Sequence, residues 1–179
     1  RHDNLHCDYI VHDQSSALRL AGQPLAIHSC AIYLCCMTLT LPDMLCFSIY
    51  SANHAMQAAY KPLLDPLGLT YPQYLVLTAL WQQDGQTVGT LGRTMRLESN
   101  TLTPLLKRME GQGLITRSRD KADERQVLIA LTPEGRAMQS RAAHVPACLL
   151  DRAGLTVDQA SALRDTIAAL RERLVPARP

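Results

Sequence analysis

Residues 96–132 constrain the fold of this chain most, because a helical pattern is followed directly by two strand patterns. Four apolar side chains recur at the spacing of one buried helix face: Leu102, Leu105, Leu106 and Met109. We expect a helix here, with Ser99 as its N-cap and Gly111 and Gly113 as stop signals. Pro104 lacks a backbone donor and would crowd the carbonyl of Asn100, so we expect the helix to begin late or to bend there.

The two runs after this helix predict a β-hairpin. Residues 114–119 and 126–131 are short and apolar-rich, and the charged residues 120–125 join them. A polar helix followed by a charged hairpin is the layout of a winged helix, a mostly α fold with a small β-wing. Such a helix fits the roughly 12 Å wide major groove of DNA, and a basic hairpin tip reaches phosphate or the minor groove. From periodicity alone, an ordinary amphipathic helix and hairpin with a solvated loop remains an alternative.

The charge of the chain supports a nucleic-acid partner only locally. The formal net charge is +2, which is a weak signal for a 179-residue chain. Within residues 93–125, however, eight Lys and Arg face five Asp and Glu. This local excess lies on the predicted helix and hairpin, where DNA would bind.

Helical patterns also precede this stretch. We expect a helix from about Pro42 to Pro66, with an apolar stripe of Leu45, Ile49, Ala52, Met56 and Ala59. A second helix, 71–81, starts at Pro72, and both helices are expected to be largely buried. Residues 82–86 are expected to form a turn and 87–94 a short helix, which makes a helix-turn-helix pair with the helix after Ser99.

Two further helices are expected after the hairpin. Residues 136–152 are predicted as one helix, bent at Pro146. Residues 156–174 carry apolar side chains at heptad-like spacing, for which a packed surface helix is the default interpretation.

The amino-terminal residues 1–37 differ from the rest. They hold four of the six cysteines and four of the six histidines: Cys7, Cys30, Cys35, Cys36, His2, His6, His12 and His28. These residues lack the compact spacings of a structural zinc site, so a metal sensor is only an alternative. The apolar run 25–41 is too short and polar for a membrane span and too distant from the start for a signal peptide. We expect a poorly ordered extension, or translation from upstream of a natural start at Met37 or Met44.

Cys46 is the candidate reactive thiol. In the early turns of a helix it lies near the positive end of the macrodipole, which favours the thiolate that attacks a peroxide oxygen. The alternative is a small buried hydrophobe between Leu45 and Phe47. Cysteines without a convincing secretory signal favour a reducing cytoplasm, where thiols stay free. Neither arginine nor threonine accompanies Cys46 in a peroxidase-like motif, so we expect no enzyme.

Three motifs resemble the MarR family of bacterial transcription regulators. Asp123-Glu124-Arg125, six residues before Leu131-Thr132, resembles the family's wing signature. The segment SNTLTPLLKRMEGQGLITR, residues 99–117, is similar to the subgroup of organic hydroperoxide-sensing repressors. LCFSIYSxxxxxxxxYKPLLDxLGLTYPQYLVLxALW, residues 45–81, resembles the same subgroup over its whole length.

This resemblance implies roles for residues of the helix and the wing. Arg125 would enter the minor groove with Asp123 steadying it. The exposed face of the helix would read the major groove, and its expected DNA-binding residues are Ser99, Asn100, Thr101, Thr103, Pro104, Lys107 and Arg108.

The resemblance also implies a sensor. Cys46 would react with peroxide, and Tyr60 and Tyr71 of the other subunit would donate hydrogen bonds to its thiolate. We interpret Tyr50 and Tyr74 as core or pocket wall. Cys148 is either a resolving thiol for the other subunit or an inert buried thiol.

The sequence thus predicts a cytoplasmic, homodimeric winged-helix repressor. Residues 38–179 would form its domain, with a DNA-binding core of about 72–132 and dimerisation helices of about 42–66 and 133–175. Oxidation of Cys46 by an organic hydroperoxide would release a palindromic operator and so derepress a thiol peroxidase gene. The main alternative is a MarR-type regulator that binds a phenolic ligand without cysteine chemistry. We expect neither a cofactor nor a membrane partner.

Overall fold

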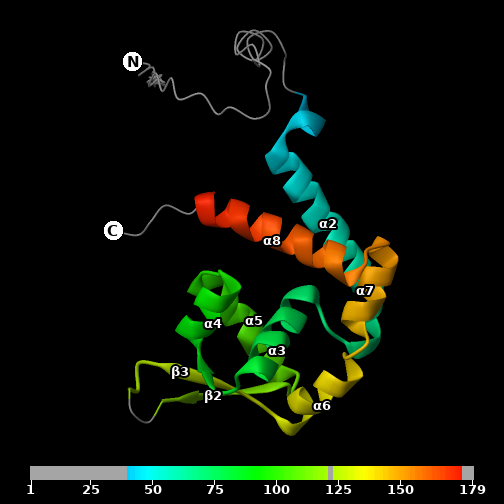
Figure 1. Ribbon diagram of the computed structural model, residues 1–179. Helices are drawn as coiled ribbons and strands as arrows, with labels where there is room; N and C mark the ends of the chain where they lie inside the picture. The colour runs from blue at the N-terminus through cyan, green and yellow to red at the C-terminus, as the bar shows by residue number, and fades with distance from the viewer. Residues whose placement is uncertain (1–39, 121–122, 175–179) are drawn as a thin grey trace, which may run out of the picture. The chain divides into compact units, whose positions relative to one another are not determined.

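The structure, a computed structural model, describes residues 40–120 and 123–174 (Figure 1). Its elements are η1 Leu41–Asp43, α2 Leu45–Leu64, η2 Asp65–Leu67, α3 Tyr71–Gln82, β1 Gln86–Thr87, α4 Val88–Met95, α5 Ser99–Gly111, β2 Ile115–Arg119, β3 Val127–Leu131, α6 Pro133–Arg141, α7 Val145–Ala153 and α8 Val157–Leu174. The prediction of a mostly helical chain with a small β-wing is confirmed. The expectations for residues 1–37 lie outside the described residues.

Residues 1–44 and 45–179 form separate units. Of the first, the structure describes residues 40–44, where Thr40 Oγ1 donates a hydrogen bond to Asp43 Oδ2 over 2.6 Å. Everything below concerns the second unit.

The hydrophobic core of the second unit lies around α5. The predicted buried face of this helix is confirmed, because all four of its apolar side chains have an exposed fraction of 5% or less. They cluster with Leu77 and Leu80 of α3, Leu91 of α4 and Ile129 of β3. Burying a leucine of this kind contributes about 1.5–3 kcal/mol, so the cluster holds α3, α4 and α5 against the sheet.

The sheet is antiparallel, with the order β1-β3-β2. The predicted hairpin is confirmed: Ile115 pairs with Leu131 and Arg119 with Val127. Gly113, at φ 71°, ends α5 in the left-handed conformation that glycine adopts readily, and so directs the chain into β2. Strand β1 was not predicted, because two residues are too short to show an alternating pattern and their pairing depends on β3.

The expected N-cap of α5 is wrong. Its N-cap is Glu98, which makes no side-chain capping bond, and Ser99 is the first helical residue. The helix begins five residues before Pro104, so the expected late start is wrong as well, while a bend at Pro104 stays a prediction. Asn100 and Pro104 are both exposed, so Pro104, which offers no backbone donor to Asn100, lies on the solvent side of the helix, opposite the buried leucines.

The predicted single helix 136–152 is also wrong. The chain instead forms α6 and α7, separated by a turn at residues 142–144. Pro146 lies in the first turn of α7, where a proline needs no backbone donor, so it starts a helix rather than bending one. Ala142 at the start of the turn and Val145 directly after it are both buried, which fixes the break.

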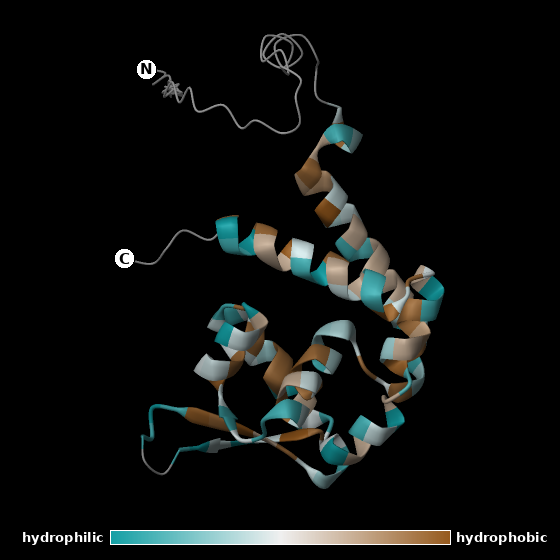
Figure 2. Cartoon of the chain, in the orientation of Figure 1, coloured by the Kyte–Doolittle hydropathy of each residue, from teal (hydrophilic) through white to brown (hydrophobic). Residues whose placement is uncertain are grey.

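Burial was predicted correctly for α3 but not for α2. In this single chain Leu64 is the only buried residue of α2, a helix described along its full length, while Leu45 is 63% exposed. Tyr50, 60% exposed, is not a core residue. Helix α8 has no buried residue among those described, so it is not a packed surface helix here. Figure 2 shows apolar residues along α2 and α8. None of the described helices is long and apolar enough to cross a membrane.

Candidate functional site

The polar face of α5 is available to a ligand. Thr87 starts α4 by accepting a hydrogen bond from the Thr90 N–H at 3.1 Å, and Arg96 ends it in the left-handed conformation at φ 55°. The chain then turns into α5, which packs against α4 (Figure 1). Of the predicted DNA-binding side chains on α5, Thr103 is half-buried and the others are exposed: Ser99, Asn100, Thr101, Pro104, Lys107 and Arg108.

The tip of the wing presents an oriented arginine. Asp123 Oδ1 accepts hydrogen bonds from the backbone N–H and from Nε of Arg125, both at 3.1 Å, and Oδ2 accepts one from Gln126 at 3.2 Å. These bonds, that of the Arg125 side chain first, hold the pKa of Asp123 below its usual range. The Arg125 side chain is nevertheless 91% exposed. The expected contact between Asp123 and Arg125 is therefore present, and insertion of Arg125 into DNA stays a prediction.

A cluster of tyrosines lies where α2 ends and α3 begins. The ring centroids of Tyr60 and Tyr71 are 4.7 Å apart, and those of Tyr60 and Tyr74 are 5.8 Å apart. Burial, followed by the neighbouring Tyr71 and Tyr74, raises the pKa of Tyr60 to about 12. Burial and then Tyr74 raise the pKa of Tyr71 as well. Both hydroxyls therefore stay protonated at neutral pH and can donate hydrogen bonds to an anion.

Cys46 lies far from these tyrosines within its own chain. It is exposed and is the second residue of α2, whereas Tyr60 lies 14 residues further along the same helix. At a rise of 1.5 Å per residue the two are roughly 21 Å apart. The structure thus brings Tyr60 and Tyr71 together but leaves the Cys46 thiol of the same chain outside their cluster.

Cys148, the candidate resolving thiol, lies on a different helix from Cys46. Cys148 is half-buried on α7, a helix that packs against α2. Among the described residues no group of three or more His, Cys, Asp and Glu side chains is arranged to hold a metal ion.

A pocket of about 690 Å³ opens between α3 and α5. Its lining includes Gln73, Leu105, Arg108 and Gln112. Gln73 Nε2 donates a hydrogen bond to Gln112 Oε1 over 2.7 Å, so the two helices are bridged at the pocket wall.

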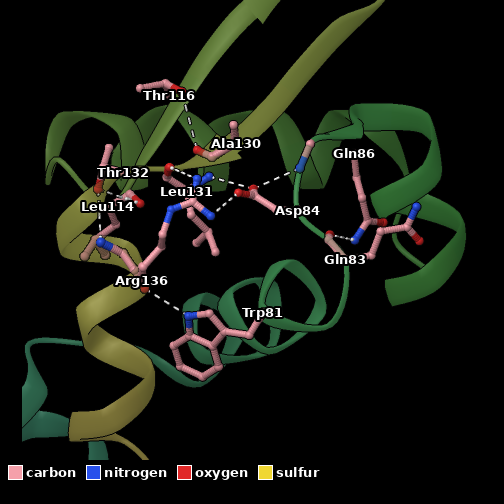
Figure 3. A network of polar contacts seen from close by, with 12 residues as sticks. Trp81, Gln83, Asp84, Gln86, Leu114, Thr116, Ala130, Leu131, Thr132 and Arg136 are labelled. Carbon is pink, nitrogen blue, oxygen red and sulfur yellow. Dashed lines mark hydrogen bonds and ion pairs between the residues drawn. The ribbon is translucent and has the colours of Figure 1, made fainter.

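Sequence reasoning did not identify a group of polar contacts at the base of the wing (Figure 3). Asp84 and Arg136 form an ion pair of 2.6 Å, although they are 52 positions apart (136 − 84). The only sequence signal was Asp84-Gly85, which predicts a turn and not a partner.

The helix-turn-helix, its exposed polar face and the wing with its exposed arginine define a winged-helix DNA-binding protein. Residues 58–141 match the family described as transcriptional regulator SarA/Rot. The chain belongs to the MarR family of winged-helix transcription regulators and is similar to its organic hydroperoxide regulators.

Two relatives and one solved structure support this assignment. The HTH-type transcriptional regulator TtmR of Methylorubrum extorquens is 45% identical over 135 residues, which cover 75% of this chain and 69% of the relative. The organic hydroperoxide resistance transcriptional regulator of Bacillus subtilis is 44% identical over 134 residues, which cover 75% and 91%. The solved structure is that of reduced AbfR of Staphylococcus epidermidis bound to DNA. It is 35% identical to this chain with a TM-score of 0.64, and the match covers 75% of this chain and 94% of AbfR. AbfR has also been solved in overoxidised and disulfide forms.

Proposed function

We propose that this protein is a homodimeric, cytoplasmic repressor that senses organic hydroperoxides through Cys46. The observation that carries the proposal is the pair of protonated tyrosines, Tyr60 and Tyr71, at one end of α2 with an exposed thiol at the other end. A two-fold pair of chains would place the thiol of each protomer near the phenols of its partner.

The exposed apolar residues support a dimer. Apart from Leu75, the large apolar side chains exposed among the described residues of the second unit lie in positions 45–56 and 157–174. An apolar surface of this extent on two helices favours a partner of the same kind, because monomers rarely leave such surface in water. A dimer would also space two α5 helices for successive turns of a palindromic operator.

The sensing chemistry is a two-electron oxidation. The thiolate of Cys46 would attack the terminal oxygen of the hydroperoxide, so that a sulfur–oxygen bond forms and the oxygen–oxygen bond breaks. The sulfur becomes a sulfenic acid, and the alkoxide leaves and takes up a proton as an alcohol. Two phenols stabilise the thiolate without a full positive charge, and their rings favour an apolar peroxide.

Release of DNA follows from the loss of that anion. A neutral sulfenic acid accepts the two phenolic hydrogen bonds less well, so the protomers would shift and move the two α5 helices out of register with the groove. Loss of one good base contact costs about 1–3 kcal/mol, so a small displacement is sufficient. The relative named for organic hydroperoxide resistance supports a thiol peroxidase gene as the target.

The proposal is tested by a gel shift on the DNA upstream of the protein's own gene, with and without cumene hydroperoxide. Wild type is expected to bind when reduced and to dissociate on oxidation, whereas Cys46→Ser is expected to stay bound. Equal release of both proteins would remove Cys46 from the mechanism. Cys148→Ser is the matched thiol control, and loss of a peroxide-induced dimer band on a nonreducing gel would assign Cys148 as the resolving thiol.

The pocket between α3 and α5 favours a second candidate, a regulator that responds to a small phenolic ligand. Its volume of about 690 Å³ suits such a ligand, and Arg108 at its wall would attract an anionic one. Under this function a phenolic acid would release the operator from wild type and from Cys46→Ser alike, and peroxide would release neither.

A further inference from the structure

The wing is joined to the rest of the fold at its base by Asp84 and Arg136 (Figure 3). Asp84 lies in the turn between α3 and β1, and its Oδ1 accepts hydrogen bonds from the N–H groups of Gly85 and Leu131, both at 2.8 Å. Its Oδ2 pairs with Arg136 Nη1 at 2.6 Å, and Arg136 Nη2 donates to the Leu131 carbonyl at 3.3 Å. The last residue of β3 is therefore held through both its backbone groups.

The first turn of α6 is held from two further directions. Trp81 Nε1 of α3 donates a hydrogen bond to the Gly135 carbonyl at 2.9 Å. Thr132 donates from Oγ1 to the Gly113 carbonyl at 2.6 Å and from its N–H to the Leu114 carbonyl at 3.1 Å, so α6 is also joined to the start of β2. The base of both wing strands and the start of α6 are thus fixed to the end of α3.

Stability alone is a poor explanation for the ion pair. The Arg136 side chain is 60% exposed, and exposed ion pairs contribute little to the free energy of unfolding. What these contacts restrict is the direction in which β3 leaves its last residue, Leu131. The Asp84 carboxylate and the Arg136 guanidinium each bond to Leu131 and to one another.

The direction of β3 determines where Arg125 projects. Leu131 and Arg125 are six residues apart on β3 and its tip, which is roughly 20 Å of extended chain at about 3.3 Å per residue. A rotation of about 10° at the base therefore moves the tip by about 3.5 Å, more than a hydrogen bond tolerates.

We infer that Asp84 and Arg136 are positioning residues for the wing, which act through Leu131 to set where Arg125 meets operator DNA. The inference rests on the proposed DNA-binding function. Neither residue needs to touch DNA.

The first test compares Arg136→Met with Arg141→Met. Arg141 lies on the same helix and pairs with Glu134 at 3.0 Å, so the control loses the same charge and an ion pair but no contact with β3. Operator affinity is measured over a range of salt concentrations, with the active fraction of each protein found by stoichiometric titration. Arg136→Met is expected to bind about tenfold more weakly with a salt slope shallower by about 1 to 2 for a dimer, while Arg141→Met matches wild type. A merely structural role would lower the active fraction and leave the slope unchanged.

Asp84→Asn separates positioning from simple electrostatics. Removing an acidic group near a phosphate backbone would strengthen binding by electrostatics alone, whereas loss of positioning weakens it. We expect weaker binding and a shallower salt slope. Binding that is unchanged or tighter would overturn the inference.

The second test asks whether the effect passes through Arg125. In an Arg125→Ala background, Arg136→Met is expected to cause little further loss of affinity, because the wing contact is already gone. Equal losses in both backgrounds would overturn the inference, as would identical salt slopes for Arg136→Met and Arg141→Met. If wild type itself fails to bind its upstream DNA, the proposed function falls and this inference with it; if wild type binds and only the variants fail the test, the inference falls alone.

Discussion

Gly135→Ala is the substitution for which the structure predicts the largest effect from the smallest change. A Cβ added at Gly135 would lie 2.0 Å from the Leu114 carbonyl oxygen, where ordinary contact begins at about 3.4 Å. The obstacle is backbone rather than a flexible side chain, so α6 has to move away from β2 by about 1.4 Å. That movement strains the hydrogen bond from Trp81 to Gly135 and the one from Thr132 to Leu114.

The net change in the free energy of unfolding follows from two destabilising contributions and one stabilising contribution. Overpacking of this kind costs about 1–3 kcal/mol. The two strained hydrogen bonds add about 1 kcal/mol each. Alanine's better helix propensity returns up to about 1 kcal/mol. We therefore expect unfolding to become easier by about 2–5 kcal/mol, which lowers the melting temperature by roughly 4–20 °C for a chain of this length.

The assay is urea denaturation followed by tryptophan fluorescence. Trp81 is the chain's single tryptophan and donates to Gly135, so it reports directly on this contact. Several protein concentrations are needed, because a dimer gains stability with concentration. Gly111→Ala is the matched control: Gly111 is also a helical glycine, at the end of α5, but an added Cβ there meets nothing within 4 Å. We expect Gly111→Ala to be as stable as wild type or slightly more so. If Gly135→Ala unfolds at the same urea concentration as Gly111→Ala, the packing argument at the base of the wing is wrong.

Two further predictions concern acid stability and assembly. Burial raises the pKa of Asp84, but hydrogen bonds from Leu131 and Gly85 and the Arg136 guanidinium outweigh it and leave the pKa below its usual value. The extra stability of wild type over Asp84→Asn should therefore be complete at pH 6. It should shrink as the pH falls below about 3.9, the pKa of an unfolded aspartate, and through the pKa of Asp84 in the folded protein. A stability difference that stays constant down to pH 3 in urea titrations would contradict this. Ile167→Asp places a charge on the exposed apolar side of α8, where Ile167 is 49% exposed, so it should shift sedimentation from dimer to monomer without changing the circular dichroism spectrum. Thr166→Asp, one position along the helix, serves as the control, and equal dissociation of the two variants would speak against an interface on that side.

The winged helix was readable from the sequence because its signals are local. The leucines of α5 recur with the helical period, and the strands of the wing are short apolar runs on either side of a charged tip. Pro72 at the start of α3 and the glycines at the end of α5 are signals of the same kind. Each depends on neighbours within a few residues, so no knowledge of the tertiary structure was needed.

The break between α6 and α7 and the surroundings of α2 could not be predicted from the sequence. Pro146 was interpreted as a bend in one helix, yet it starts α7, because the buried Ala142 and Val145 fix a turn just before it. The stripe of α2 was interpreted as a core face, yet it is exposed in the single chain. Periodicity shows that a helix has an apolar side but does not show which surface covers that side.

The sequence by itself determined α5, the wing and the residue types of the proposed sensor, since each depends on local spacing. The tertiary structure alone decided that Tyr60 and Tyr71 meet, through the turn at Gly68 with φ 67°, and that Cys46 is held roughly 21 Å away by the straight run of α2. It also decided that Asp84 joins Leu131 and Arg136 at the base of the wing. Contacts between residues so far apart in the chain arise from the packing of whole elements, and no short stretch of sequence records them.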